Sequence, residues 1–241
     1  MGGNLKTGGD MNESLIDLDK QMLLQLNGSD SLFIDGMITT LTAAQTWIPL
    51  YVALFYLVIK NNDSVKNIFT IVACAAACVL LAGSVDDLLV KPLVARWRPT
   101  HDPEIGMAVD IVEGYRGGNY GFFSAHAANT FSIAIFFSLM VKNAYLSLSL
   151  LVWSVTNCWT RIYLGVHYPG DILAGLVWGG IIGVSVFTAY RFLSHQKVKN
   201  ANFVSSQYTS TGYVVSDVDI VISVLVFTFF YALVRACLTP L

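Results

Sequence analysis

Six long apolar stretches limit what this sequence can fold into more than any other feature. They cover residues 38–59, 68–85, 124–141, 145–160, 172–190 and 220–238. A helix needs about 20 mostly apolar residues to cross the hydrocarbon core of a bilayer, and a spanning segment must bond its own backbone polar groups. The stretches therefore predict an all-α integral membrane protein, built as a bundle of six helices. The fourth stretch is short, and we expect it to continue through Arg161 toward the membrane interface.

The composition supports a membrane protein and excludes one class of partner. Of the 241 residues, 55% are hydrophobic and 12% charged, whereas soluble domains contain about 25% charged residues. The net charge is -2 at pH 7, which leaves no basic surface for nucleic acid. We therefore expect the bilayer as a partner and no nucleic acid. The sequence does not indicate an oligomeric state.

Small residues recur at four-residue spacing within two of the stretches. Cys74 and Cys78 form one such pair, and Gly175, Gly179 and Gly183 form a longer series. Metal binding at the cysteines would need further ligands from a neighbouring helix, so we interpret both sets as surfaces for close helix packing.

Residues 1–35 are predicted to form an N-terminal segment, and residues 36–241 the six-span membrane domain. After Ser14, the apolar residues Leu15, Leu18, Met22 and Leu26 fall on one helical face. We expect an interfacial amphipathic helix that ends at Asn27-Gly28; the alternative is a soluble helix resting on the bundle. Because residues 1–35 lack the uninterrupted apolar core of a signal peptide, we expect the first span to direct insertion.

Six spans place the N-terminus, the loops after the second and fourth spans and the C-terminus on one membrane face. Most basic residues of this face lie in the segments that form the candidate site described next. Without those, the opposite face is the more basic and is predicted to be cytoplasmic. It carries Lys60, Lys66, Lys142, Arg191, Lys197 and Lys199.

Three segments with ionisable side chains meet the non-cytoplasmic face, at residues 91–99, 123–126 and 161–171. Ionisable residues at such positions are costly and indicate function. The cations among them are Lys91, Arg98 and Arg161, and arginine matches phosphate oxygens in a bidentate way. The alternative for Lys91 and Arg98, and also for Arg96, is a role as snorkelling anchors. We favour a phosphate site because Arg161 is harder to explain as an anchor.

Backbone groups and a serine add to this site. If Ser124, Ala125 and His126 begin the third span, their free N–H groups suit an anion. An isolated histidine at a helix start is more often structural than catalytic. Beside a second histidine, His167, and several cations, His126 is instead expected to act in acid–base catalysis.

His167 and Asp171 are spaced so that the carboxylate can orient the imidazole. Asp171 could equally cap the fifth span, and the two roles are compatible. We predict that neutral His167 attacks phosphorus, that His126 protonates the leaving oxygen, and that His126 later activates water. The cations stabilise the equatorial oxygens, so the cycle requires no metal and no cofactor.

The first two of these segments match known motifs. Lys91 is followed after six residues by Arg98-Pro99, which fits the pattern Lys, six residues, Arg-Pro. Residues 123–126, Phe-Ser-Ala-His, keep the serine and histidine of the pattern Pro-Ser-Gly-His. Ala125 adds a methyl group where the pattern has glycine and the backbone should approach phosphate. The pocket is therefore expected to be narrower than one with glycine at this position.

The third segment completes the set. Thr160-Arg161, His167 and Asp171 fit the pattern Ser-Arg, five residues, His, three residues, Asp, with Thr in place of Ser. Three ordered motifs with their internal spacing make a specific signal. In them the sequence resembles the type 2 phosphatidic acid phosphatases, which share their site with vanadium haloperoxidases.

The resemblance implies a metal-independent lipid phosphatase with a phosphohistidine intermediate. It also implies His167 as nucleophile, Asp171 as its orienting carboxylate and His126 as general acid. The phosphate-binding residues would be Lys91, Arg98, Ser124, Ala125 through its backbone, and Arg161.

Family members of this size with six spans are bacterial inner-membrane lipid phosphatases. Their substrates include undecaprenyl diphosphate, phosphatidylglycerol phosphate, phosphatidic acid and lipid A. We expect a lipid phosphate as substrate, and undecaprenyl diphosphate first, because a site on the periplasmic or outer face suits its recycling. Acceptors other than water stay open.

Two other functions fit part of the sequence. An intramembrane serine protease would use Ser124 with a histidine base, but it leaves the cations without a purpose. A lipid-phosphate binder or transporter would use the cations, yet it would not need the histidines. Near the site, His101 is expected to be a loop residue or a substrate-selecting contact, and Arg96 with Arg116 is a candidate pair for a second phosphate.

Overall fold

The computed structural model describes residues 8–194 and 206–238, and helices dominate both ranges. Within them the only β structure is two isolated bridges, Trp97 with Tyr120 and Tyr208 with Val214. The α-helices are α1 (Gly8–Leu26), α2 (Leu32–Thr42), α3 (Ile48–Lys60), α4 (Val65–Val85), α5 (Lys91–Val94), α6 (Ala125–Val141), α7 (Ala144–Tyr163), α8 (Pro169–Leu193) and α9 (Val215–Leu238).

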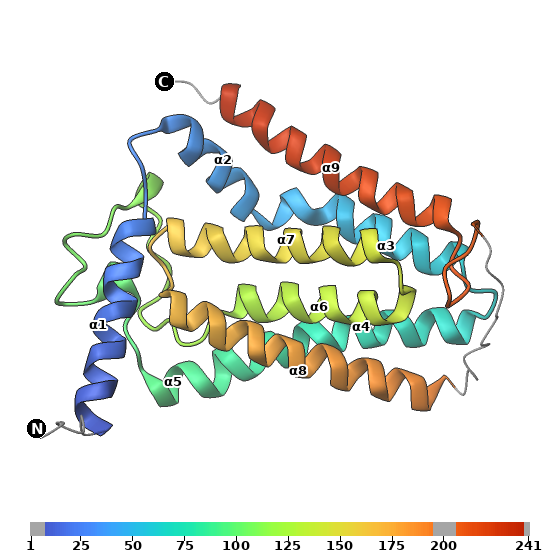
Figure 1. The fold of residues 1–241 in the computed structure, drawn as a ribbon, viewed down its shortest axis with the longest axis horizontal. Helices are drawn as coiled ribbons and strands as arrows, with labels where there is room; N and C mark the ends of the chain where they lie inside the picture. The colour runs from blue at the N-terminus through green and yellow to red at the C-terminus, as the bar shows by residue number, and fades with distance from the viewer. Residues whose placement is uncertain (1–7, 195–205, 239–241) are drawn as a thin grey trace, which may run out of the picture.

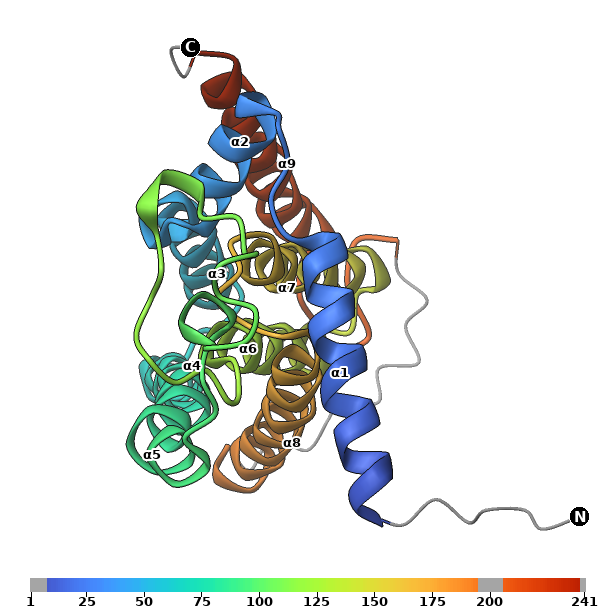
Figure 2. The same cartoon turned by 90° about the vertical axis from the view of Figure 1, so that its left-hand side faces the viewer.

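Helices α3, α4, α6, α7, α8 and α9 run side by side along the molecule (Figure 1). Viewed from one end, α6 lies among α4, α7 and α8, and it packs against all three (Figure 2). Its central position explains why α6 is apolar around most of its surface, since a helix enclosed by others has no polar face. Buried residues such as Phe136 and Trp153 form the main core.

The six predicted apolar stretches each coincide with helical structure. Three continuous helical segments are long and apolar enough to cross a membrane: Val65–Val94, Pro169–Leu193 and Val215–Leu238. A bent pair, Leu32–Thr42 with Ala44–Lys60, raises the number to four, and Ala125–Val141 is a shorter apolar helix. The described part of the chain is thus an all-helical protein with three to four candidate membrane spans.

The first predicted span is not one straight helix, which corrects the sequence interpretation. Helices α2 and α3 meet at an angle of 66°. Ala43 is extended at the break, a 3-10 turn covers Ala44–Trp47, and Pro49 stands in the first turn of α3. Because proline cannot donate a backbone hydrogen bond, it begins a helix rather than continuing one. The Trp47 indole N–H donates to the Leu41 carbonyl at 2.8 Å and bridges the break.

The second predicted span continues farther than its apolar pattern indicates. After α4, a π-helical turn covers Asp86–Val90 and leads directly into α5, where the Lys91 N–H donates to the Asp86 carbonyl. Because of this turn, Lys91 lies near the C-terminal end of a continuous helical segment that runs from Val65 to Val94.

The glycine series of α8 lies against the backbone of α6, as the packing interpretation predicted. A Cβ atom added at Gly175, Gly179 or Gly183 would lie 2.6, 2.4 or 2.8 Å from a carbonyl oxygen of the neighbouring segment. The cysteines of α4 are also packing residues, since Cys74 is 7% and Cys78 0% exposed.

Helix α1 crosses the end of the bundle instead of joining it (Figures 1 and 2). It ends at Leu26 as predicted, followed by Gly28 with a positive φ of 62°. It begins at Gly8, not at the predicted cap Ser14. Leu15 and Leu18 of the predicted apolar face are 63% and 50% exposed, whereas Leu23 is buried. The apolar face therefore points away from the bundle.

One end of the bundle collects the segments that the sequence placed on the non-cytoplasmic face. Figure 1 shows α1, α5, the α5–α6 chain, the start of α8 and the end of α9 at its left side. The N-terminal helix and the loops after α5 and α7 are thus neighbours. Lys197 and Lys199, which entered the orientation argument, lie outside the described residues.

Candidate active site

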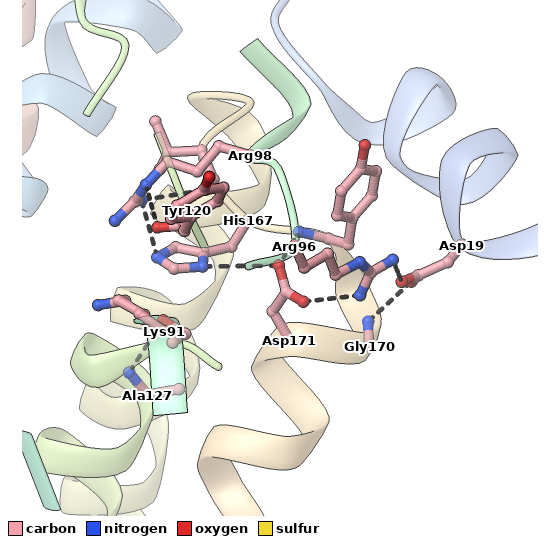
Figure 3. Close-up of polar contacts among 12 residues, drawn as sticks. Asp19, Lys91, Arg96, Arg98, Tyr120, Ala127, His167, Gly170 and Asp171 are labelled. Atoms are coloured by element: carbon pink, nitrogen blue, oxygen red, sulfur yellow. Dashed lines mark hydrogen bonds and ion pairs between the residues drawn. The ribbon is translucent and has the colours of Figure 1, made fainter. Parts of the chain in front are cut away.

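The three polar segments meet at this end of the bundle (Figure 3). Arg98 comes from the α5–α6 chain, His167 from the short turn after α7, and Asp171 from the first turn of α8.

Arg98 is held by the backbone on both sides of the site. Its Nε donates to the Tyr120 carbonyl and its Nη1 to the Val166 carbonyl, each at 3.1 Å. The same Nη1 lies 3.1 Å from Nε2 of His167. The guanidinium is therefore fixed directly beside one ring nitrogen of the predicted nucleophile.

Asp171 faces the other ring nitrogen of His167. Its Oδ2 lies 3.7 Å from Nδ1, slightly beyond hydrogen-bond length, and it also accepts the Tyr168 N–H at 3.0 Å. Asp171 thus caps α8 and stands beside the imidazole at once, so both roles considered for it are compatible with the structure. His167 and Asp171 are 2% and 0% exposed.

Arg161 is buried near the end of α7, with 2% of its surface exposed. Its guanidinium lies 5.7 Å from the centre of the Tyr115 ring, and its Nη1 is 3.5 Å from the Tyr115 hydroxyl. The Nη2 atom is buried without a hydrogen-bond partner. A buried cationic donor left without a partner is costly and fits an anionic ligand.

Ser124 is the N-cap of α6, and its buried hydroxyl accepts the Ala127 N–H at 3.4 Å. Ala125 and His126 follow as the first helical residues, so the predicted backbone donors do begin a helix. The His126 side chain is exposed and lies close enough to Arg161, His167 and Arg98 for their charges to act on it.

Lys91 is engaged by two carboxylates. Its Nζ lies 2.7 Å from Asp86 and 2.5 Å from Asp87. Asp86 is fully buried, whereas the Asp87 side chain is 62% exposed. The predicted phosphate ligand therefore already has anionic neighbours, and a phosphate would share it with them.

Arg96 forms two ion pairs beneath the site. Its Nη1 lies 2.7 Å from Asp171 and its Nη2 lies 2.6 Å from Asp19 of α1. This arrangement argues against its interpretation as a ligand of a second phosphate. Arg116 is exposed on the loop, and His101 ends a short 3-10 turn, Pro99–His101, where it contacts the Thr100 hydroxyl at 3.1 Å.

The electrostatics of the site favour a neutral nucleophile. Burial, together with the charges of Arg98, Lys91 and Arg161, holds the pKa of His167 well below its usual value. Burial also lowers the pKa of Arg98, which stays protonated because an arginine titrates far above neutrality. In the described ranges, no group of three or more His, Cys, Asp or Glu residues could hold a metal ion.

Sequence reasoning missed four residues around the site. Asp86 and Asp87 precede Lys91 by five and four residues, a spacing that could have indicated their ion pairs with it. Tyr115 lies in a glycine-rich loop without a motif. Asp19 has no local signal, because it reaches Arg96 across 77 residues of chain.

Comparisons with known proteins identify relatives of this chain. A model of the PAP2 superfamily matches residues 67–195. A lipid A 4'-phosphatase of Bacteroides thetaiotaomicron is 39% identical over 188 residues, which cover 77% of this chain and 81% of that protein. A lipid A 4'-phosphatase of Porphyromonas gingivalis is 34% identical, covering 75% and 76%.

A more distant relative is a decaprenylphosphoryl-5-phosphoribose phosphatase of Mycobacterium tuberculosis. It is 38% identical over 116 residues, which cover 48% of this chain and 58% of that protein. No solved structure matches the chain.

Proposed function

The chain belongs to the PAP2 superfamily and is a lipid phosphatase, and from this premise we propose that it hydrolyses the phosphate monoester of a lipid A-type glycolipid. The observation that carries the proposal is the similarity to two lipid A 4'-phosphatases over about three quarters of the chain, at 39% and 34% identity. Undecaprenyl diphosphate, which the sequence suggested first, has weaker support than this alternative.

The proposed reaction begins at Nε2 of His167. A lone pair on this nitrogen attacks phosphorus, the N–P bond forms, and the P–O bond to the sugar breaks. Asp171 lies on the Nδ1 side and stabilises the positive charge that develops on the ring. The Arg98 Nη1 group, 3.1 Å from Nε2, turns its N–H from the ring nitrogen to an oxygen of the incoming phosphate, which frees the lone pair for attack.

His126 is proposed to serve both halves of the cycle. It gives its proton to the leaving alkoxide, then takes a proton from the water that attacks the phosphohistidine. The N–P bond breaks, and phosphate leaves. Arg161, Lys91 and the start of α6 at Ser124 and Ala125 are proposed to hold the equatorial oxygens, so the cycle needs no metal and no cofactor.

We propose that all six helical segments cross the bacterial inner membrane and that α1 lies in its outer interface. The exposed apolar side chains of α1, among them Leu15 and Leu18, support this placement. The end of the bundle with His167 would then face the periplasm, where a lipid phosphate in the outer leaflet reaches it.

The test is phosphate release by the purified full-length protein in detergent, with EDTA present. The substrates are lipid A, undecaprenyl diphosphate, phosphatidylglycerol phosphate and phosphatidic acid. We expect lipid A to be the preferred substrate, release to survive EDTA, and His167→Ala to abolish it. His101→Ala is the matched control and should keep most of the activity, because this loop histidine contacts Thr100 instead of His167.

Each other outcome has a definite meaning. Preference for another lipid would overturn the substrate but not the reaction. Loss of activity in EDTA, restored by a divalent cation, would overturn the metal-independent mechanism. No release from any lipid, with wild type and His167→Ala binding lipid A equally, would leave a binder or transporter.

A further inference from the structure

We propose that Asp19, on α1, is a positioning residue for the hydrolysis: it fixes Arg96 and the start of α8, and through them the carboxylate beside His167. The inference rests on the proposed function, in which His167 is the nucleophile. It adds to that function a requirement for the N-terminal helix, which contains none of the three motifs.

Asp19 is linked to Asp171 by two short routes (Figure 3). Its Oδ2 lies 2.6 Å from Nη2 of Arg96, whose Nη1 lies 2.7 Å from Oδ1 of Asp171. Its Oδ1 accepts the N–H of Gly170, the residue before Asp171, at 2.7 Å. One carboxylate therefore holds both a side-chain partner and a backbone neighbour of Asp171.

The ion pairs of Arg96 with Asp19 and Asp171 are largely shielded from water. The side chains of Asp19 and Arg96 are 14% and 24% exposed, and that of Asp171 is 0% exposed. The guanidinium of Arg96 also lies 4.2 Å from the centre of the Tyr168 ring, which follows His167 in the chain. Ion pairs in such partly buried surroundings are screened less than surface pairs.

Asp19 keeps Arg96 on Asp171, because without Asp19 the guanidinium could bind the substrate phosphate instead. A free guanidinium near the site would be drawn toward the substrate phosphate, and Asp171 would lose its partner at Oδ1. With Asp19 on its second nitrogen, Arg96 is bound between two carboxylates, one at each terminal nitrogen. The orienting carboxylate then keeps its position while phosphate binds and leaves.

Helix α1 is held firmly enough to carry this residue. Lys20 lies 2.5 Å from Glu104 of the α5–α6 chain. Just past the end of α1, the Asn27 side chain donates to the Tyr163 carbonyl at 2.7 Å and accepts the Asp110 N–H, also at 2.7 Å. Asp19 is thus presented to Arg96 by a helix that is anchored beside it at Lys20 and again just after its C-terminal end.

Gly170 offers a second way to disturb the same contact. A Cβ atom added there would lie 2.8 Å from Oδ2 of Asp19. Gly170→Ala should therefore push the carboxylate away, while alanine itself is well tolerated in a first helical turn. In a chain that already lacks the Asp19 carboxylate, the added methyl group should have no such effect.

The experiment measures kcat and KM for lipid A in detergent micelles, with the full-length protein. We expect Asp19→Asn to lower kcat about tenfold, or about 1.4 kcal/mol of activation free energy, and to change KM less than about twofold. Asp19→Glu, which keeps the carboxylate, should have a kcat between those of Asp19→Asn and the wild type. Asp17→Asn, an equal charge change at an exposed position of α1, should match wild type.

A double-mutant cycle separates positioning from simple loss of fold. Gly170→Ala should lower kcat in the wild-type chain but not in Asp19→Ala. Losses that multiply, or a fall in kcat that only follows a fall in melting temperature, would overturn the inference. So would wild-type kcat in Asp19→Asn, and this result would leave the proposed function intact.

Binding of orthovanadate provides a readout without turnover, because vanadium adopts the five-coordinate geometry of phosphorus during transfer. We expect Asp19→Asn to weaken vanadate binding about tenfold, with Asp17→Asn unchanged. Equal vanadate affinity in wild type and Asp19→Asn overturns the inference even if no lipid is hydrolysed. Absence of wild-type phosphate release counts against the proposed function alone.

Discussion

Arg98 and His167 are in direct contact: Nη1 of the arginine lies 3.1 Å from Nε2 of the imidazole. The contact places a positive charge against the ring nitrogen that faces away from Asp171. The charge disfavours protonation of the ring. The pH dependence of the enzyme follows from it.

We expect no acid limb near pH 6.5 in kcat/KM from His167. The pKa of this residue is held well below its usual value by burial first and then by the charges of Arg98, Lys91 and Arg161. A base with a lowered pKa stays neutral as the pH falls, and loses its reactive form only below that pKa. Removing one cation with Arg98→Gln should raise the pKa and move the acid limb to higher pH. The check is a profile from pH 4 to 9, with the exposed Arg116→Gln as control; an unmoved limb contradicts the assignment.

Asp171→Asn should lower kcat by roughly 10³- to 10⁴-fold, the loss seen when the carboxylate behind a catalytic histidine becomes an amide. The amide would face Arg96 and the Tyr168 N–H, two donors that a carboxylate accepts and an NH₂ group cannot. Single-turnover measurement of phosphohistidine formation is the appropriate assay. Asp63→Asn, the same chemical change at an exposed position of the α3–α4 loop, should have little effect; a similar kcat in the two variants would rule out an orienting role for Asp171.

Lys91→Met should destabilise the protein as well as inactivate it. Asp86 is fully buried and lies 2.7 Å from the Lys91 ammonium, so its charge loses its partner. Breaking a buried pair on one side costs about 3–5 kcal/mol. Adding Asp86→Asn should restore the melting temperature in detergent but not the phosphatase activity. If the double variant melts no higher than Lys91→Met, the ion pair is not what stabilises this turn.

Gly179→Ala should reduce stability by about 1–3 kcal/mol, the usual cost of overpacking. The new Cβ atom would lie 2.4 Å from the Ala128 carbonyl of α6, and a backbone atom of a packed helix cannot move aside cheaply. Gly180→Ala is the matched control, since its Cβ would meet the Phe131 ring edge at 3.3 Å. Thermal unfolding of both variants in detergent measures the difference, and equal melting temperatures would contradict close α6–α8 contact.

Much of the arrangement was predictable from the sequence. The apolar stretches gave the long helices, and the motif spacing brought Arg98, His167 and Asp171 together correctly because each motif stands where a helix meets one end of the bundle. The family resemblance drawn from these motifs is confirmed by the PAP2 match. The break at residues 43–47 was signalled only by Pro49, which the apolar pattern obscured.

The features that could not be predicted from the sequence depend on contacts between segments that are distant along the chain. The position of Asp19 depends on how α1 lies across the bundle, and no periodicity in its own helix specifies that angle. The preferred lipid was also beyond the motifs, because they describe the phosphate and the histidine but not the rest of the substrate. The proposal of a lipid A-type substrate rests instead on similarity over about three quarters of the chain to two lipid A 4'-phosphatases.

The π-helical turn at Asp86–Val90 determines the direction in which the Lys91 side chain points. The number of residues in this stretch therefore matters for the candidate active site. An α-helix rotates by about 100° per residue, so deleting one residue here would restore regular winding and swing Lys91 away from the phosphate. The chain between α5 and α6 is a loop and could absorb the same deletion. Among homologous chains, insertions and deletions should therefore accumulate after Arg98-Pro99 and be absent between Asp86 and Lys91.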